Sequence, residues 1–563
     1  MAMSPFGRSA VALECNKPDA DHIIIGKQTS GVSGFDPHLN ASGPAAEIIG
    51  NLYETLVTIQ NGKPDPYSSL AMWHEPKGAS WTFTIKPGWR FASGKPIRAR
   101  DVEFSLKRAI KVNSSPAHPL AHLGLTPINA DQRIRADQEN AYILTIELPE
   151  VVEKEIVLHC LSSASCSILD AELVKRRRTI SPIIPVTCRY APLEGSAYPG
   201  LGPPDACRHD PLDGGETWLR FNSAGSGPFM IRNAERTDEI FLERNVCHSD
   251  YDDKSPNSLP LIVRDIADPR MQQRLLQCGE IHVAWDTAVE IAPVVAPKKG
   301  GRAKGTKKST GSTFDHKQHS KANLLLLCMN TTKAPLNDPK IREGIRRTID
   351  NSEFETPRWT AQNRFFPSAI DGFAFTAPTP YNLAQARLAL KNHQCSLKLD
   401  YLTGAGRSSV ANGLAWQFAK AGINLVLDPA STGYIFQERL QKREFDLALI
   451  SLSSDYLHPH SNAHALCTNP EFEESHTFEG THTLAWHCHW HDDELIKTIA
   501  NAAKASGPAA QLEFYKHIQD DLMVRGPYAF LLEETVHVRG IGVFLPQLGA
   551  LDNQTRYSPP KPT

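Results

Sequence analysis

The stretch that most constrains the fold of this chain runs from residue 51 to residue 109. It begins with apolar side chains at helical spacing and continues into a segment where Trp81, Phe83 and Ile85 alternate with threonines, as in a β-strand with one buried face. Glycine and proline turns separate the pieces. Asp101 precedes a further helical pattern, where a carboxylate interacts favourably with the helix dipole. The stretch contains no nucleophile, metal-binding motif or phosphate-binding loop, so it is predicted to be scaffold.

Length and charge narrow the class of protein. The chain has 563 residues, too many for a single hydrophobic core, so we expect two or three lobes. Its 60 Lys and Arg residues nearly balance its 62 Asp and Glu residues, which argues against a surface that binds nucleic acid. No stretch approaches the roughly 20 apolar residues needed to span a bilayer. These features predict a soluble protein with several lobes.

The order of predicted elements in the later part of the chain is typical of an α/β lobe. Strands are predicted at 397–402, 425–427 and 446–452, and helices at 411–421 and 434–441. This alternation of strand and helix predicts a sheet covered by helices.

Two segments lack such periodicity. Residues 176–216 are dense in proline and glycine, and residues 295–321 combine lysine and arginine with glycine, serine and threonine. Because such compositions cannot bury a core, both segments are predicted to be surface insertions. For the second segment, a basic patch that binds nucleic acid or acidic lipid is the less favoured alternative.

The scaffold stretch resembles the family 5 extracellular solute-binding proteins, the peptide- and nickel-binding receptors of ABC importers. The segments that carry the resemblance keep the order and approximate spacing of the family's motifs. They are YETLV at 53–57, LAMW at 70–73, a strand and turn at 81–91, and SGKPIRARDVEFS at 93–105. With interruptions, the resemblance extends over roughly residues 21–550.

The resemblance implies a two-lobed α/β fold of the periplasmic-binding-protein kind, in the large peptide-binding class (type II). In this architecture the chain crosses twice between the lobes, and a small domain is inserted in the first lobe. Mapped onto this chain, it predicts residues 21–45, 217–322 and 530–563 in lobe I, 46–216 in the inserted domain, 323–529 in lobe II, and 1–20 as an N-terminal tail.

A polar segment that follows the predicted strand at 446–452 is the best candidate for ligand contact. It contains Ser454, Asp455 and Tyr456. It leaves the carboxyl end of a predicted strand, where open α/β sheets usually bind ligands. In peptide-binding members of the family the matching aspartate pairs with the ligand's α-ammonium group. The resemblance therefore implies Asp455 as the anchor for a cationic amine, and a solvent-facing turn aspartate is the alternative.

Other candidates for the cleft wall are less specific. The resemblance places the turn that contains Ser33 and Gly34 along the cleft. Trp285 is a candidate aromatic wall, with burial in a core as the equal alternative. Peptide receptors of the family often bind the ligand's carboxylate with an arginine or lysine. No such residue can be assigned by motif, which leaves open whether the ligand is a peptide.

The chain contains eleven cysteines, so at least one has no disulfide partner within the chain. In dipeptide-binding members of the family a small disulfide loop follows the ligand-binding aspartate. The resemblance implies a bridge between Cys467 and Cys488, which would close a loop of about 20 residues and contribute roughly 3 kcal/mol. Two free thiols are the alternative.

Histidines are concentrated around Cys488, at His458, His460, His464, His482, His487, His489 and His491. Imidazole and thiolate bind zinc, copper or nickel, and the family includes nickel receptors. However, the chain has neither an HExxH motif nor a pair of CxxC motifs. We predict a solvated, histidine-rich surface loop, with no dedicated metal site and no cofactor.

The resemblance implies a non-catalytic receptor of an ABC importer, which captures a small solute such as a short peptide and delivers it to the membrane permease subunits. It also implies a monomer. The absence of a GxSxG motif and of a glycine-rich phosphate loop argues against an enzyme. A cytoplasmic ligand-sensing regulator built on the same module and a nickel or metal-chelate receptor are the alternatives.

The amino-terminal sequence bears on location. The first 15 residues contain no apolar stretch of secretory length. We expect either that an export signal is missing from this sequence or that the protein stays in the cytoplasm. The family resemblance favours a periplasmic or extracytoplasmic location.

Overall fold

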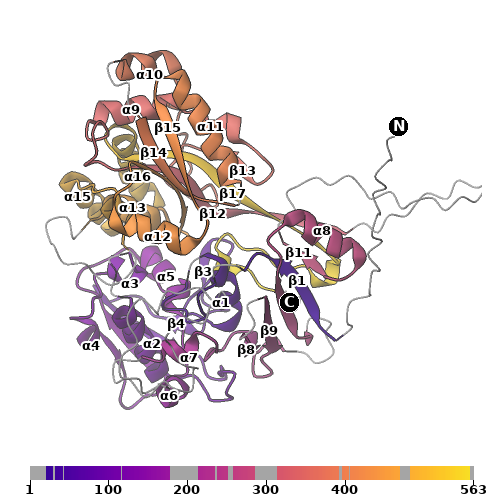
Figure 1. Ribbon diagram of the computed structural model, residues 1–563. Helices are drawn as coiled ribbons and strands as arrows, with labels where there is room; N and C mark the ends of the chain where they lie inside the picture. Colours follow the sequence, from indigo (N-terminus) through magenta and orange to yellow (C-terminus); the bar gives the residue numbers. More distant parts are fainter. Residues whose placement is uncertain are drawn as a thin grey trace, which may run out of the picture.

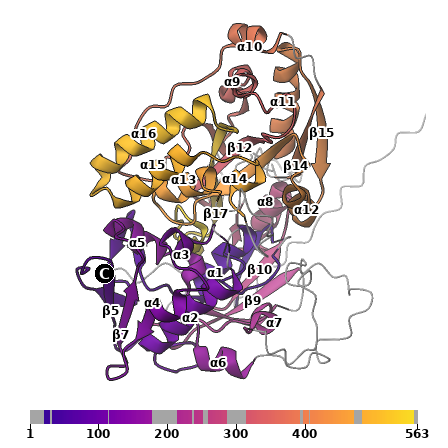
Figure 2. The ribbon, with the colours of Figure 1, turned by 90° about the vertical axis from the view of Figure 1, so that its left-hand side faces the viewer.

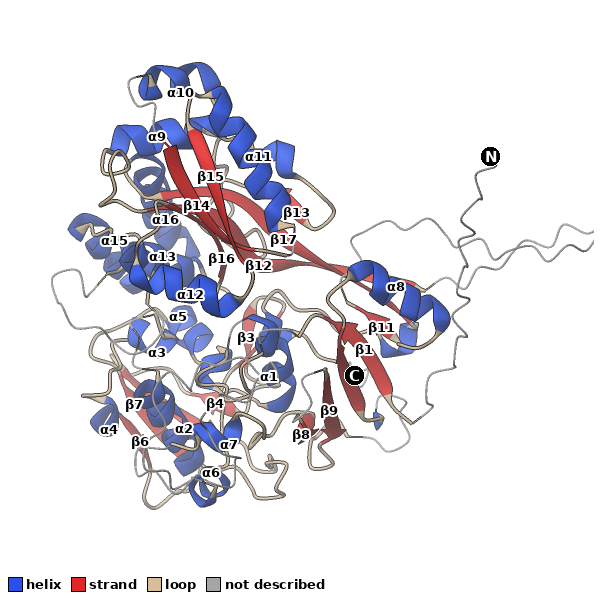
Figure 3. Cartoon of the chain, viewed as in Figure 1, coloured by secondary structure: helices blue, strands red, loops and turns tan. Residues whose placement is uncertain are grey.

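The structure is a computed structural model that describes residues 21–557 except 30–31, 42, 114, 116, 178–213, 235–237, 252–257, 286–313, 392–395, 405 and 470–481. In this part of the chain the strands form an eleven-stranded sheet, a four-stranded sheet and a two-stranded sheet. Figures 1 and 3 show two bodies joined by long strands. We call the body with β13–β16 and α9–α16 lobe II, and the body with β1–β11 and α1–α8 lobe I.

The eleven-stranded sheet runs through both lobes. Its order is β15-β14-β16-β12-β17-β11-β1-β10-β9-β8, and β13 pairs with β17 off this path. The strands are β1 Ile23–Lys27, β8 Phe229–Asn233, β9 Glu239–Arg244, β10 Leu261–Asp265, β11 Val283–Ala284, β12 Asp315–Met329, β13 Trp359–Ala361, β14 Ser396–Leu402, β15 Asn424–Ala430, β16 Leu447–Ser453 and β17 Tyr528–Gly540.

Strands β12 and β17 connect the two lobes. They pair antiparallel from Asp315↔Gly540 to Cys328↔Tyr528, with register shifts between Ser320 and Leu324 and between Leu325 and Leu326. Lobe II strand β16 also pairs with β12, and lobe I strand β11 pairs with β17. A movement of one lobe against the other would therefore bend these two strands.

The alternation of side chains along β12 explains its continuous apolar sequence in lobe II. Leu324, Leu326 and Cys328 belong to one buried cluster, whereas Leu325 and Leu327 belong to another. Successive side chains of a strand point to opposite faces, so helices must cover both faces of this sheet. The helices of lobe II are α9 Pro339–Thr348, α10 Leu383–Leu390, α11 Arg407–Lys420, α12 Gly433–Lys442, α13 Pro459–Cys467, α14 Leu484–His487, α15 Asp493–Lys504 and α16 Pro508–Val524.

Lobe I combines its half of the large sheet with a four-stranded sheet. The central strand β1 is parallel to both β10 and β11. The four-stranded sheet has the order β4-β5-β7-β6. The smaller strands are β2 Thr58–Gln60, β3 Lys63–Asp65, β4 Ala71–Trp73, β5 Ser80–Ile85, β6 Ile134–Ala136 and β7 Ile143–Glu147. The helices are α1 Ala46–Leu52, α2 Ala99–Val112, α3 Pro119–His122, α4 Ala130–Arg133, α5 Lys154–Cys160, α6 Ala171–Arg176, α7 Glu216–Leu219 and α8 Pro269–Cys278.

The scaffold stretch forms its predicted elements. The predicted alternation appears as β5, whose Trp81, Phe83 and Ile85 are buried. Asp101 lies in the first turn of α2, where its side chain accepts a hydrogen bond from the Arg98 backbone N–H at 3.1 Å. Burial raises the pKa of the Asp101 carboxyl, although the neighbouring Lys95 ammonium at 3.2 Å opposes this shift. The carboxylate thus defines where this helix begins.

The two predicted insertions fall largely on residues outside the described ones. Where residues 315–321 are described, they form the first part of β12 and not a surface insertion. Most of their side chains are exposed, so the polar composition does not conflict with a strand paired on its backbone to β17.

Candidate functional site

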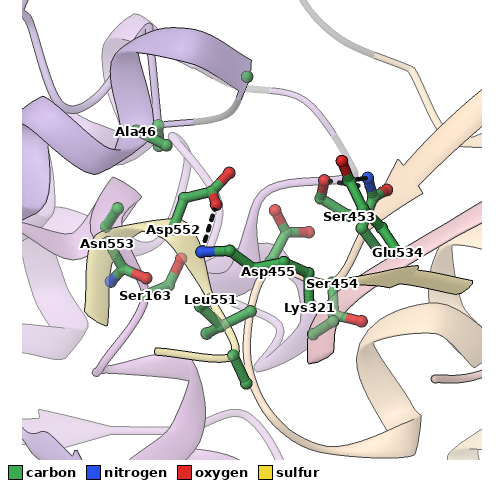
Figure 4. Close-up of a pocket in the computed structure, with 16 residues that line it drawn as sticks. Ala46, Ser163, Lys321, Ser453, Ser454, Asp455, Glu534, Leu551, Asp552 and Asn553 are labelled. Atoms are coloured by element: carbon green, nitrogen blue, oxygen red, sulfur yellow. Dashed lines mark hydrogen bonds and ion pairs between the residues drawn. The ribbon is translucent and has the colours of Figure 1, made fainter. Parts of the chain in front are cut away.

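A cavity lies where lobe I meets the carboxyl end of β16. Its free volume is about 50 Å³, roughly that of a few water molecules. Figure 4 shows side chains from both lobes around it. The lining residues are Ala41, Gly43, Ala46, Ser163, Ala164, Lys321, Ala322, Asn323, Ser453, Ser454, Asp455, Glu534, Ala550, Leu551, Asp552 and Asn553.

The end of β16 and the start of α13 position Asp455. The Ser454 backbone N–H donates to the Ala322 carbonyl at 2.8 Å, which keeps the segment beside β12. The Ser454 hydroxyl donates to the Asn462 side chain at 2.6 Å, and the Asp455 N–H donates to the Ser461 hydroxyl at 2.9 Å. Because two residues of α13 hold the turn, the Asp455 carboxylate is free to line the cavity.

Asp455 is a half-buried carboxylate that forms no ion pair among the described residues. Figure 4 shows it among the lining side chains. Burial raises the pKa of the Asp455 carboxyl to about 7. A desolvated carboxylate of this kind is stabilised by a cation that enters the cavity.

The other charged groups of the cavity have partners. The Lys321 ammonium pairs with Asp552 at 2.9 Å. Burial opposes the charge of Lys321, yet the carboxylates of Asp552 and Glu47 raise its pKa above the ordinary value. Glu534 accepts from Arg358 at 2.6 Å. With these groups neutralised in pairs, the charge left for a ligand is the negative charge of Asp455.

A half-buried cation lies beside strand β16, at the start of α11. The Arg407 guanidinium donates to the Ser451 hydroxyl at 3.0 Å, and Ser451 lies on the same face of β16 as Ser453 of the cavity. Burial lowers the pKa of Arg407 below its ordinary value. In the described ranges no carboxylate forms an ion pair with it. Arg407 can therefore bind an anionic group.

Sequence reasoning did not identify Arg407, although one signal was present. Arg407 starts α11, directly after Gly404, Ala405 and Gly406, at the carboxyl end of the predicted strand 397–402. Loops at this end of an open α/β sheet carry ligand contacts. Lys321, Glu534 and Asp552 gave no comparable signal, because they meet only in the tertiary structure.

The structure brings two of the six predicted ligand contacts to the cavity, Ser454 and Asp455. Tyr456 follows them but turns into a core, where its hydroxyl lies 2.8 Å from His122 Nδ1. Ser33 and Gly34 are outside the cavity lining: the Ser33 hydroxyl donates to Asn40, and Gly34 lies against Arg220.

Trp285 also lies away from the cavity lining. It is buried in the lobe I core, with the Lys27 ammonium 5.0 Å from the ring centroid. This placement corresponds to the alternative of a core tryptophan, because its ring packs among apolar residues beneath β1.

The expected bridge between Cys467 and Cys488 is not formed in the structure. Both thiols are free and buried. Cys488 lies beside Cys328 of β12, within hydrogen-bond reach. Burial raises the pKa of the Cys467 thiol well above its ordinary value, so this thiol is poorly nucleophilic.

The prediction of a solvated histidine-rich loop is wrong for several of its members. His458 and His460 flank the start of α13 and are 1% and 2% exposed, and His487 in α14 is also buried. Apolar helices pack over this segment, which its polar sequence did not indicate. In the described part of the chain, no group of three or more His, Cys, Asp or Glu is arranged to hold a metal ion.

Among the described residues, none of the helices has the length and apolar character required to cross a membrane.

Comparison with known proteins places these observations in context. The sequence model for the bacterial extracellular solute-binding proteins, family 5, middle region, matches residues 61–473. The probable D,D-dipeptide-binding periplasmic protein DdpA of Escherichia coli (strain K12) is 22% identical over 548 residues, which covers 93% of this chain and 92% of that protein. The periplasmic oligopeptide-binding protein OppA of Haemophilus influenzae is 19% identical over 355 residues. The matched region covers 62% of this chain and 57% of that protein.

Solved structures agree in fold. The periplasmic binding protein DppA of Helicobacter pylori, in complex with the peptide STSA, superposes with a TM-score of 0.70 at 17% identity, covering 95% of this chain and 98% of that one. NikA of Staphylococcus aureus, in complex with Ni(L-His)2, superposes with a TM-score of 0.69 at 14% identity, covering 96% of this chain and 100% of that one. At these low sequence identities, both similarities establish the fold of this chain and no more.

Proposed function

The chain belongs to the bacterial extracellular solute-binding proteins of family 5, and from this premise we propose that its ligand is a short peptide bound between the lobes by both of its charged ends. The family serves ABC importers as binding proteins, so the chain is a receptor for a small solute. We further propose that it acts as a monomer in the periplasm and presents its ligand to the permease subunits.

The observation that carries the proposal is a pair of opposite charges outside ion pairs among the described residues, Asp455 in the turn after β16 and Arg407 at the start of α11 beside that strand. The Asp455 carboxylate faces the cavity, and the Arg407 guanidinium lies beside Ser451, four residues earlier. Along the chain, Ser451 and Asp455 are four residues apart, which corresponds to roughly 13 Å at about 3.3 Å per residue and sets the scale of the separation between the two charges. A zwitterionic peptide of two to four residues has a matching length.

Two charge-assisted contacts explain how peptides of different sequence could share one site. The α-ammonium group would pair with Asp455 and the α-carboxylate with Arg407. Such contacts are stronger in a dry cleft than in water. The side chains of the peptide would then add little to the positioning of its ends.

Ligand entry requires the lobes to separate, because a peptide does not fit into about 50 Å³. We propose that residues 323–529 move as lobe II against 21–322 and 530–563, bending β12 and β17 where they cross between the lobes. A ligand that contacts both sides shifts the equilibrium toward the closed form by its differential affinity for that form.

Calorimetry with the Asp455→Asn variant tests the ammonium contact. A library of di- to tetrapeptides is first screened by thermal shift, and one hit is titrated into the wild type and the variant. We expect at least a tenfold loss of affinity in the variant, because one charge-assisted contact is lost. The exposed Asp371→Asn variant is the matched control and should bind as the wild type does.

The N-acetylated form of the same peptide completes the experiment. It lacks the ammonium group, so it should bind the wild type weakly and should not distinguish the wild type from Asp455→Asn. If the acetylated and free peptides bind the wild type equally, Asp455 does not recognise an amine and the proposal fails.

A further inference from the structure

A cluster of histidines that do not line the cavity lies in the contact between the two lobes. His122 ends α3 of lobe I, and His460 and His464 lie one turn apart on α13 of lobe II. The His122 and His464 rings stack with centroids 3.7 Å apart, and the His460 ring is 6.2 Å from His122. Figures 1 and 2 both show α3 and α5 facing α13 across the boundary between the lobes.

The cluster is held by neutral contacts. The Tyr456 hydroxyl lies 2.8 Å from His122 Nδ1, although the two residues are 334 positions apart in sequence. Three ring nitrogens, His122 Nε2, His460 Nδ1 and His464 Nδ1, are buried and have no hydrogen-bond partner. A second histidine pair, His159 of α5 and His458 before α13, extends the same contact with centroids 6.1 Å apart.

We propose that His122, His460 and His464 form a histidine latch that keeps the lobes together while the rings are neutral and releases them when acid protonates the rings. A positive charge on either stacked ring would face its neighbour at close range inside a desolvated contact. Separation of the lobes would expose both rings to water and remove this cost.

The groups around the latch do not supply a compensating negative charge. From lobe I these are His118, which caps α3, and His159 and Cys160 of α5. Burial is the main cause that lowers the His122 pKa, and the charges of His464, His460 and His118 lower it further. From lobe II they are Tyr456, His458, Tyr515 and the carboxylate of Asp455 before α13.

The other charged groups at the boundary between the lobes do not pair with the latch. Glu153 lies at the start of α5, and Lys504 pairs with Glu150 across the same boundary. Neither Asp455 nor Glu153 forms an ion pair with a latch ring, and Asp455 itself becomes neutral below pH 7.

The direction of the pH effect follows from the burial of the rings. Burial lowers the pKa of His464 to about 3 and that of His460 to about 4, whereas an exposed imidazole has an ordinary pKa of about 6.5. The open form therefore binds protons that the closed form excludes, and closure is lost as pH falls below about 6.5. Each ring exposed on opening changes the open–closed ratio by up to about tenfold per pH unit.

Scattering without ligand tests the latch independently of the proposed peptide specificity. We expect the radius of gyration of the wild type to increase between pH 7.5 and pH 5, with retained helix content by circular dichroism. The variant His122→Gln/His460→Gln/His464→Gln, which removes all three latch rings, should increase its radius of gyration less than the wild type does. The matched control, His74→Gln/His517→Gln, replaces two exposed histidines and should open as the wild type does.

Two results would overturn the inference. The first is a wild-type radius of gyration that does not change with pH, and the second is equal opening of the latch variant and the control. If the latch variant does not fold, the latch is tested in the wild type instead. Mass spectrometry then measures the rate of hydrogen exchange at the Cε1 position of each histidine ring. His122 and His464 should then exchange at least tenfold more slowly than His517 at pH 7.5, and equal rates would contradict the latch.

Discussion

Asp455 illustrates how one half-buried carboxyl is expected to set both affinity and its pH dependence. Burial raises its pKa to about 7, and no cation among the described residues offsets this shift. In the free protein the carboxyl is therefore about half ionised near neutral pH. A bound ammonium group would stabilise the ionised form and lower the pKa in the complex.

This shift predicts an acidic limb in the affinity profile. Below pH 7 the free protein must release a proton to bind an amine, so affinity should fall by up to about tenfold per pH unit. Above about pH 8 the ligand's own α-amino group loses its proton, which lowers affinity again. Calorimetry from pH 6 to pH 9, with a peptide hit and the wild type, should show a maximum near pH 7 to 8.

The Asp455→Asn variant is the control for this profile. In this variant the affinity for the peptide should not fall as the pH decreases below 7, and it should be weak from pH 6 to pH 9. The histidine latch acts only below about pH 6.5, so the fall in affinity between pH 7 and pH 6.5 reports on Asp455 alone. An unchanged acidic limb in the variant would show that another group is responsible.

At the scale of elements, β12 shows how a strand buried on both faces divides two cores. Leu326 points into one cluster and Leu327 into the other, and both are fully buried. Because helices cover each face, neither position can relax toward solvent. The continuous apolar run of this strand thus reflects two separate packing surfaces.

Truncation on either face of β12 should therefore cost similar stability. Leu326→Ala and Leu327→Ala each remove a buried leucine and leave a cavity, so we expect a loss of about 2–5 kcal/mol in each case. Urea denaturation followed by circular dichroism measures it. Leu388→Ala on the exposed face of α10 is the control and should change the free energy of unfolding by less than about 0.5 kcal/mol. A cost confined to one face would contradict the two-core description.

For the whole molecule, the crossing strands and the small cavity connect binding to shape. Residues of both lobes line the cavity, and β12 and β17 are shared between the lobes. Ligand exchange then requires a change in the distance between the lobes. Such a change is visible in solution scattering.

Scattering at pH 6, where protonated histidines favour separated lobes in the ligand-free protein, should detect ligand-induced closure. We expect a saturating peptide to reduce the radius of gyration of the wild type to the value calculated for the closed structure, and the Asp455→Asn variant to remain larger at the same peptide concentration. The Asp371→Asn variant should follow the wild type. Identical curves for the wild type and Asp455→Asn at a peptide concentration that saturates only the wild type would contradict this coupling.

The sequence by itself determined the local elements and the family. Apolar spacing predicted β5, β14–β16, α11 and α12 to within a few residues, because a strand or helix is set by contacts between neighbours in the chain. It also placed Asp455 at the end of a strand, since loops after strands carry ligand contacts. The family's motifs, kept in order along residues 53–105, identified the architecture.

Only the tertiary structure decided which charges remain unpaired and which histidines meet. Lys321 is neutralised by Asp552, more than 200 residues later, and His122 stacks on His464 from the other lobe. It also turned Tyr456 and Trp285 into core residues and left Cys467 and Cys488 as separate thiols. Periodicity is a property of neighbouring residues, whereas charge pairing and burial depend on which distant segments the folded chain brings together.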